Sequence, residues 1–128
     1  MLSSAISAQG FSIARIQYSG GGDWYADPSS LPNLIDFISN ETNIKIENNE
    51  FKIKLTSENL YNHTYLYLTG HGNIRFNDEE VRVLRNHLLK GAFLHADDNY
   101  GMYDSFKREM KKVFPDKEWV ELPIDHPI

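Results

Sequence analysis

The sequence predicts an α/β domain with a mainly parallel sheet that helices cover on both faces. Segments with the periodicity of strands and of helices alternate along the 128 residues, which is typical of such sheets. Residues 65–69 are apolar on both faces, as in a strand at the centre of a parallel sheet. Glycine-rich or polar loops follow three of the expected strands, where this kind of sheet binds ligands.

The first strand is predicted over residues 11–18 and ends at a loop of three glycines. Ser30 is placed to cap the helix that follows, and Pro32 falls in its first turn, where a missing N–H costs little. The apolar face of this helix carries Leu31, Leu34, Ile35 and Ile38. The pattern therefore predicts one helix packed against the sheet.

Two strands are predicted in the middle of the chain. Apolar residues alternate with lysines over residues 51–55, which indicates a strand at or near a sheet edge, because lysines discourage further pairing. A short helical turn is expected over residues 57–61. The apolar strand over residues 65–69 then runs into Gly70, His71 and Gly72.

The next helix has the best-marked start in the sequence. Asn77 is the expected cap, Glu80 occupies the capping-box position, and Asp78 and Glu79 stand in the positive first turn. Phe76 is placed to pack onto Val81, and Gly91 is expected to end the helix. Residues 92–96 then predict a buried strand.

The last part of the chain predicts a third helix and a fifth strand. Met102, Phe106 and Met110 recur at helical spacing, and Pro115 is expected to close the helix. Residues 119–122 have the pattern of a strand, which gives the order β-α-β-β-α-β-α-β. Because three helices are few to cover five strands, we expect one domain over residues 11–128 that is incomplete at its C-terminus.

Residues 1–10 show no periodicity and are expected to be disordered. Their small-residue run ending at Gln9 also resembles the end of a secretory signal, so two alternatives stay open. A signal remnant would make the protein an exported one, and otherwise it is cytoplasmic.

Composition excludes several classes of function. The net charge of −5 argues against nucleic acid as the main partner. The absence of cysteine excludes thiol nucleophiles, disulfides and thiolate metal sites. No apolar run approaches the roughly 20 residues of a membrane span, so the chain as given is not transmembrane.

Three loops at the carboxyl ends of expected strands combine glycine with polar side chains. Parallel strands bring such loops together, so we expect them to line one crevice. The candidate ligand-binding residues are Gly20, Gly21, Gly22, Asp23, Trp24, Tyr25, Thr69, Gly70, His71, Gly72, Asn99 and Tyr100. The candidate catalytic residues are His71, Asp97 and Asp98.

Most of these residues allow both a functional and a structural interpretation. The three glycines could form a nest for an anion, but a tight turn with positive φ explains them as well. His71 could exchange a proton, bind metal or only hydrogen-bond a neighbouring strand end. Trp24 and Tyr25 could stack on a ring or sugar, or simply cover the sheet edge.

The adjacent carboxylates Asp97 and Asp98 should point to opposite sides of their strand. One of them could face the crevice while the other caps the following helix. A metal site built from one of them with His71 and Asp23 is conceivable, but the spacing matches no ligand signature. We therefore expect no bound metal and no cofactor.

Five segments in order resemble the bacterial family catalogued as domain of unknown function 4159. They are residues 15–25, 68–72, 93–101, 106–110 and 121–127. The resemblance implies a flavodoxin-like, three-layer α/β/α sandwich of the class I glutamine-amidotransferase-like superfamily. It implies no known activity, although members are often exported or membrane-associated.

The resemblance also bears on catalysis. Related amidotransferases carry a cysteine nucleophile on a sharp strand-to-helix turn, and the similar turn here, residues 97–101, has Asn99 in that place. Glutamine hydrolysis is therefore not carried over. Two hypotheses follow: a degenerate domain that binds a small polar ligand or a protein partner in the crevice, or a hydrolase that uses His71 with Asp97 or Asp98, with or without a metal.

Overall fold

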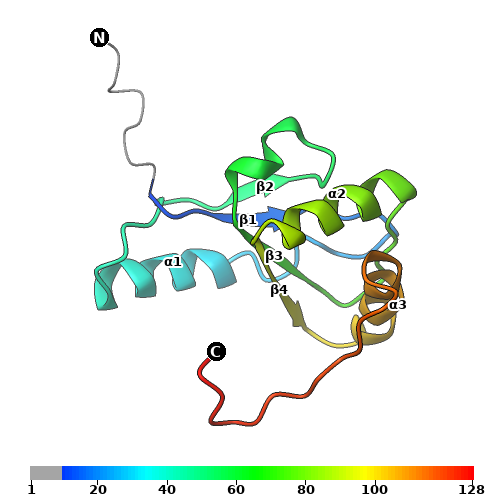
Figure 1. Cartoon of the computed structure of the whole chain (residues 1–128). Helices are drawn as coiled ribbons and strands as arrows, with labels where there is room; N and C mark the ends of the chain where they lie inside the picture. The colour runs from blue at the N-terminus through cyan, green and yellow to red at the C-terminus, as the bar shows by residue number, and fades with distance from the viewer. Residues whose placement is uncertain (1–9) are drawn as a thin grey trace.

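The computed structural model describes residues 10–128 (Figure 1). The expectations of a disordered segment and of a signal remnant fall on residues 1–9 and lie outside the described part of the chain. The elements are β1 (Ile13–Ile16), α1 (Ser30–Glu41), β2 (Phe51–Ile53), the 3-10 helix η2 (Glu58–Asn62), β3 (Tyr65–Gly70), α2 (Asp78–Leu89), β4 (Phe93–Asp98) and α3 (Tyr103–Val113).

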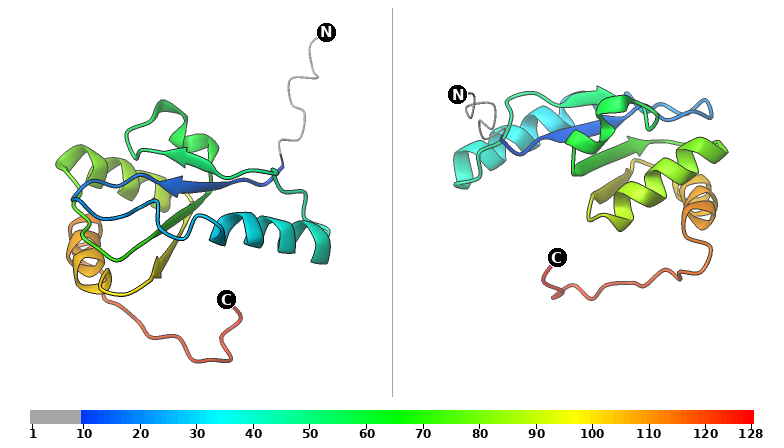
Figure 2. Two further views of the ribbon diagram at one scale, coloured as in Figure 1. Left: turned by 180° about the vertical axis from the view of Figure 1, so that it is seen from behind. Right: turned by 45° about the horizontal axis from the view of Figure 1, so that its top comes forward.

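The strands form one parallel sheet in the order β2-β1-β3-β4. This is the order of the first four strands of a flavodoxin-like fold. Helix α1 lies on one face of the sheet, and α2 and α3 lie on the other (Figure 2). The predicted α/β class, the edge position of β2 and the central position of β3 are confirmed.

Side chains of β1 and β3 alternate between two apolar cores. Leu66 and Leu68 point toward α2 and α3 and belong to the larger core. Ile13 and Tyr67 face the other way and pack against α1 through Leu31 and Ile35. The period of two along each strand therefore separates the residues of the two faces, and it places Arg15 on the α1 face with Ile13.

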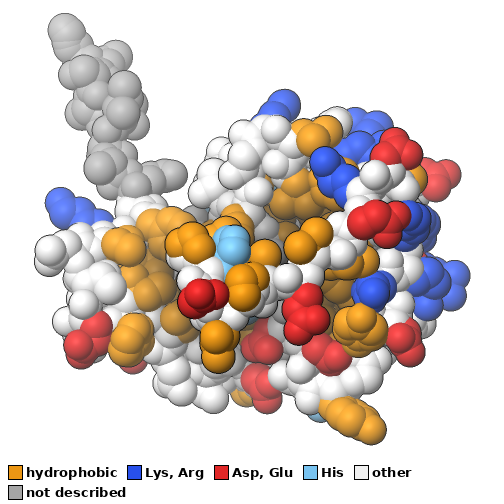
Figure 3. Space-filling model, turned by 60° about the horizontal axis from the view of Figure 1, so that its bottom comes forward, with side chains coloured by type: hydrophobic (Ala, Val, Ile, Leu, Met, Phe, Trp, Pro, Cys, Tyr) orange, Lys and Arg blue, Asp and Glu red, His pale blue; other side chains and the backbone are white. Residues whose placement is uncertain are grey.

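The predicted fifth strand is absent from the described residues. Residues 119–122 make no ladder, and the Trp119 ring packs instead against Phe106 of α3, with 5.7 Å between ring centroids. Strand β4 is consequently a sheet edge, and its predicted burial is wrong, since Phe93 is 46% exposed. Figure 3 shows hydrophobic side chains exposed beside a histidine on the underside of the molecule.

The two helix starts differ from each other. The capping box of α2 is confirmed, because Asn77 Oδ1 accepts the Glu80 N–H and Glu80 Oε2 accepts the Asn77 N–H, both at 2.8 Å. Ser30 is not a cap. It is the first residue of α1, and its hydroxyl donates to the Asp27 carbonyl at 2.9 Å.

Among residues 10–128, no helix has the length and apolar character needed to cross a membrane.

Gly91 ends α2 with a φ of +109°, as predicted from its position after the last helical residues. A Cβ atom there would meet nothing within 4 Å, so a substitution tests the backbone conformation alone. We expect Gly91→Val to lower the free energy of unfolding by more than about 1 kcal/mol, and Gly91→Asn by less, because asparagine tolerates positive φ. Chemical denaturation measures both changes. An unchanged midpoint for Gly91→Val would show that the positive φ at position 91 does not require glycine.

His63 is buried at the end of the sheet where the strands begin. Its Nδ1 lies 2.9 Å from the Ser12 hydroxyl, and its ring packs against Phe51 at an interplanar angle of 43°, with centroids 4.6 Å apart. Burial, and secondarily the charge of nearby His87, lower the pKa of His63. The folded protein therefore holds this imidazole in its neutral form.

This depressed pKa predicts a pH-dependent stability. The unfolded chain binds a proton at His63 below about pH 6.5 while the folded chain resists it, so the stabilisation is complete above that pH and is lost as the pH falls through the lowered pKa. We expect the free energy of unfolding to fall between about pH 7.5 and 5.5, and this slope to be shallower in His63→Gln. If the free energy of unfolding depended on pH equally in the wild type and in His63→Gln, His63 would not be the cause of the pH dependence.

Candidate functional site

Three loops lie together at the carboxyl ends of the strands, as the parallel topology predicts. We call residues 19–25, 70–76 and 98–102 the loop cluster. The Gly22 N–H donates to the Asn73 carbonyl at 3.1 Å, and the Asn99 N–H donates to the Gly70 carbonyl, also at 3.1 Å. Ser19 additionally forms an antiparallel bridge with Arg75. The second loop is therefore bonded to both of the others.

Glycines allow the three loops to approach this closely. A Cβ atom at Gly22 would collide with the Gly72 backbone, and one at Gly101 would lie 2.9 Å from the His71 carbonyl oxygen. Gly20 and Gly21 have φ values of +119° and +86°, so the interpretation as a tight turn with positive φ is confirmed for these two. Gly22 is required for steric reasons alone.

The centre of the loop cluster is a paired histidine and aspartate. The His71 backbone N–H donates to Asp23 Oδ1 at 2.7 Å, and the His71 Nδ1 lies 2.7 Å from Asp23 Oδ2. The His71 side chain is 57% exposed and that of Asp23 is 29% exposed. One carboxylate thus fixes both the backbone and the ring of His71.

The chemistry of this pair follows from the charge of Asp23. The hydrogen bond from the His71 backbone N–H has the largest effect on the pKa of the Asp23 carboxyl and lowers it. Desolvation opposes this effect, and the hydrogen bond from the imidazole adds to it, so the pKa stays below its usual value. An ionised carboxylate can only accept hydrogen bonds, so His71 Nδ1 carries the proton. In the neutral ring Nε2 is then an acceptor, available as a general base or as a partner for a ligand hydroxyl.

Tyr18 lies beneath the Asp23–His71 pair. Its hydroxyl donates to the Thr69 carbonyl at 3.0 Å, and a Cβ atom on Gly70 would collide with it. Burial, with a smaller effect from the charge of Asp23, raises the pKa of Tyr18 to about 12. The phenol therefore stays protonated at neutral pH and supports the loop as a hydrogen-bond donor.

Neither of the adjacent aspartates is bonded to His71. Asp98 accepts the backbone N–H groups of Met102 and Tyr103, at 2.9 and 3.1 Å, and so caps α3. Asp97 Oδ2 accepts the Tyr67 hydroxyl at 2.9 Å on the α1 face of the sheet. The predicted helix cap is confirmed for Asp98, but Asp97 bonds Tyr67 on the α1 face and does not face the crevice as expected. The carboxylate beside His71 is Asp23.

The remaining residues of the third loop differ in exposure. Tyr100 is 84% exposed, whereas Asn99 Nδ2 is buried and makes no hydrogen bond to any described residue. An unpaired amide donor of this kind is costly and marks a place where an acceptor is missing. Thr69, by contrast, is fully buried, and its hydroxyl donates to the Asp97 carbonyl at 2.8 Å.

The two aromatic residues of the first loop have separate environments. Trp24 packs against the larger core, which favours the structural interpretation for that residue. Tyr25 is 63% exposed and lines a cavity next to α1 that contains no residue of the other two loops. Their rings meet edge to face, with 5.5 Å between centroids.

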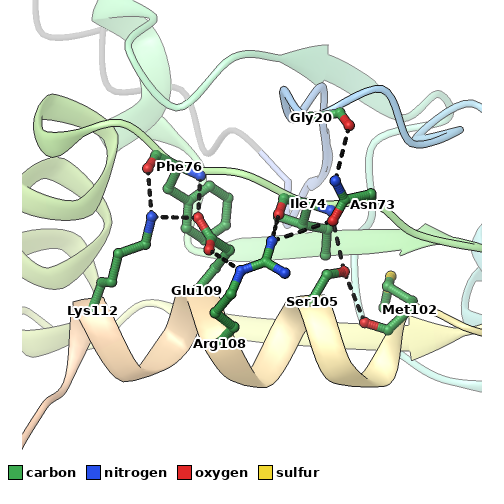
Figure 4. Close-up of polar contacts among 9 residues, drawn as sticks. All are labelled: Gly20, Asn73, Ile74, Phe76, Met102, Ser105, Arg108, Glu109 and Lys112. Carbon is green, nitrogen blue, oxygen red and sulfur yellow. Dashed lines mark hydrogen bonds and ion pairs between the residues drawn. The ribbon is translucent and has the colours of Figure 1, made fainter.

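Helix α3 holds the second loop in place through side chains that point toward it (Figure 4). Glu109, 1% exposed, accepts the Phe76 N–H and binds the ammonium of Lys112, both at 2.5 Å. Arg108 donates to the Ile74 carbonyl at 2.7 Å and pairs with Glu109 at 2.9 Å. Two basic side chains of α3, Arg108 and Lys112, therefore bond the loop that carries His71.

Two features of the structure, one in the site and one outside it, were not predicted from the sequence. The pairing of Asp23 with His71 depends on loop geometry, although both residues were candidates. Arg15, a charge inside the buried strand β1, was a visible signal of a buried ion pair, and it contacts Glu50 at 2.7 Å. Within residues 10–128, no three histidine, aspartate or glutamate side chains lie close enough together to hold a metal ion.

Comparison with known families gives one match. The family model described as a domain of unknown function, DUF4159, matches residues 12–128. No curated protein matches the chain.

Proposed function

We propose that this chain, which belongs to the DUF4159 family, binds a small polar ligand at the loop cluster through the Asp23–His71 pair. The observation that carries the proposal is the exposed imidazole whose Nδ1 is held by an ionised carboxylate. Such a ring presents Nε2 in one orientation and one tautomer, which lowers the entropic cost of binding. The ligand this chemistry favours carries a hydroxyl group, such as a sugar or a hydroxy acid.

The third loop supports a degenerate amidotransferase-like domain. Asn99 occupies the strand-to-helix turn between β4 and α3, where related amidotransferases carry their nucleophilic cysteine. Its amide cannot serve as a nucleophile, but the unpaired Nδ2 is a donor suited to a carbonyl or hydroxyl oxygen. An asparagine at this turn could therefore bind a ligand but could not form a covalent intermediate with it.

The Asp23–His71 pair also favours a second candidate function, a hydrolase. His71 Nε2 would take a proton from water while the Asp23 carboxylate stabilises the imidazolium that forms. In this candidate Asp23 has the orienting role expected of Asp97 or Asp98, both of which bond other groups. A protein partner docked on the same loops is the remaining alternative.

Spectra of the amide groups distinguish these functions. We expect monosaccharides and small hydroxy acids, added one at a time to ¹⁵N-labelled protein, to shift signals of the loop cluster in a saturable way. His71→Phe should abolish the shifts, and His126→Phe, the same change in the C-terminal tail, should leave them intact. Release of methanol from the methyl glycosides of these sugars or the methyl esters of these acids, followed in the proton spectrum of the added compound, would indicate the hydrolase. Saturable shifts confined to other surfaces would refute the proposal. The absence of any shift at about 10 mM ligand, ten times a Kd of about 1 mM, would also refute it.

A further inference from the structure

Arg15 is a charged side chain outside the Asp23–His71 pair, and its Nη1 donates to the Trp24 carbonyl of the first loop at 3.3 Å. It lies in the middle of β1 and is 1% exposed. Its Nε donates to Glu50 Oε1 at 2.7 Å, and its Nη1 donates to the Ala26 carbonyl at 2.9 Å. These two nitrogens therefore have short hydrogen bonds of ordinary strength.

The third guanidinium nitrogen is poorly satisfied. Nη2 contacts Glu50 Oε2 at 3.4 Å, and it contacts the Asp27 carbonyl and the Ser30 hydroxyl at 3.5 Å each. All three distances exceed the usual range of about 2.7–3.2 Å for such bonds. Nη2 therefore has weaker hydrogen bonds than Nε and Nη1, and it would gain most from a closer acceptor.

Arg15 lines a cavity of about 280 Å³ between α1 and the segment that leads into β2. The polar wall of the cavity consists of Arg15 together with Asn48, Asn49, Glu50 and Lys52. Tyr25, Pro32 and Ile35 form an apolar wall. The cavity thus combines donors on one side with a surface for a small ring or alkyl group on the other.

The charges around this cavity are not balanced. Glu50 is already paired with Arg15, so these two residues cancel. Lys52 is the sheet-register partner of Arg15, and no carboxylate of residues 10–128 lies within 4.0 Å of its ammonium. One positive charge at the wall remains uncompensated, and it favours a negatively charged ligand.

We propose that this cavity binds a small organic anion, with its carboxylate or phosphate group between Arg15 and Lys52 and its apolar part against Pro32 and Ile35. An oxygen of the anion completes the hydrogen bonding of Arg15 Nη2. A carboxylate offers two acceptor oxygens in a plane, and a phosphate offers acceptor oxygens in a tetrahedral arrangement. A guanidinium and an ammonium together can bind either group. The cavity shares Tyr25 with the loop cluster but is not lined by Asp23 or His71, so the proposal stands whether or not His71 binds a ligand.

Titrations followed by amide and arginine side-chain NMR test this site in the intact chain. The probes are benzoate, phenyl phosphate and inorganic phosphate, with benzyl alcohol as the uncharged control. We expect saturable shifts of the Arg15 Nε signal and of residues 48–52 with benzoate or phenyl phosphate, and none with benzyl alcohol. The organic probe that binds with the lower Kd identifies the preferred head group as a carboxylate or a phosphate. If inorganic phosphate bound and neither organic probe did, the proposed role of the apolar wall would be wrong.

Substitutions of two lysines in and beside β2 provide the matched comparison. Lys52→Met should weaken the binding of the better probe at least about tenfold, while Lys54→Met, the same charge change outside the cavity lining, should alter it less than about twofold. Neither lysine is buried, so both variants should fold. Equal affinities in the two variants, or no saturable shifts at the cavity with either organic probe, would overturn the proposal.

Discussion

Replacing Glu109 with alanine is expected to lower the free energy of unfolding by about 3 kcal/mol. The carboxylate is buried and serves as the common acceptor for the Phe76 N–H, Lys112 and Arg108. Its removal leaves a buried N–H without a partner and two cations without their counter-charge. Because Lys112 and Arg108 are 44% and 49% exposed, water compensates part of the loss, and the effect stays below that of a fully buried triad.

A conservative variant and a matched control separate this effect from general changes of charge. Glu109→Gln keeps the shape and one acceptor, so we expect a smaller loss of about 1–2 kcal/mol. Glu118→Gln removes an exposed glutamate that lies 3.6 Å from Lys111, and it should change stability by less than about 0.5 kcal/mol. Equal denaturation midpoints for Glu109→Ala and Glu118→Gln would show that the contacts of Glu109 do not stabilise the fold.

The contribution of Glu109 to the free energy of unfolding should also depend on pH. Burial alone would raise the pKa of this carboxyl, but hydrogen bonds from Lys112, the Phe76 N–H and Arg108 outweigh it and lower the pKa. The stabilisation is therefore present above the unfolded pKa of about 4.3 and is lost as the pH falls through the folded value. The stability difference between the wild type and Glu109→Ala should shrink in acid for this reason.

The second large effect is expected from Gly22→Ala, about 3 kcal/mol of destabilisation. The φ angle of Gly22 is not in the left-handed region, so the loss comes from the collision of the new Cβ with the Gly72 backbone. Relief of this collision requires the first and second loops to separate. The separation would also pull Asp23 away from His71, and the imidazole signals should shift.

Gly21→Ala is the matched control in the same loop. Gly21 has a φ of +86°, and a Cβ atom there meets nothing within 4 Å, so only the conformational strain of about 1 kcal/mol is expected. The His71 signals should stay in place in this variant. If Gly21→Ala were as destabilising as Gly22→Ala, close packing of the loops would not be the reason for glycine at position 22.

Local sequence signals predicted those parts of the fold that depend on neighbours in the chain. The capping box of α2 involves residues three positions apart, and the positive φ of Gly91 follows from its place after the helix. The lysines of β2 likewise indicated an edge strand, which the sheet order confirms. Each of these features is decided by short-range hydrogen bonds, conformation or exposure.

The errors occurred where a distant partner decides the outcome. Residues 119–122 have the composition of a strand, but the Trp119 ring packs on α3, and the segment forms no ladder with any described strand. The predicted burial of β4 failed with it, since a strand at the edge keeps one side open. Strand propensity describes a fit to a pleated surface and does not supply the partner.

The position of the three loops was predicted, but the hydrogen bonds of their side chains were not. Parallel topology alone brings the loops after β1, β3 and β4 to one end of the sheet. The choice of Asp23 as the partner of His71 depends on the turn made by Gly20 and Gly21, which side-chain chemistry does not specify. Asp97 and Asp98 were equally suitable in charge, but their strand and helix contacts direct them elsewhere.

The protonation of the two His71 ring nitrogens tests the Asp23–His71 pair most directly. A long-range ¹H–¹⁵N spectrum of the neutral ring should show a protonated Nδ1 and an unprotonated Nε2, because the ionised Asp23 carboxylate can only accept. Asp23→Ala should remove this preference, while Asp125→Ala, in the exposed tail, should preserve it. A ring protonated at Nε2 in the wild type, or a spectrum unchanged by Asp23→Ala, would contradict the pair and the ligand site built on it.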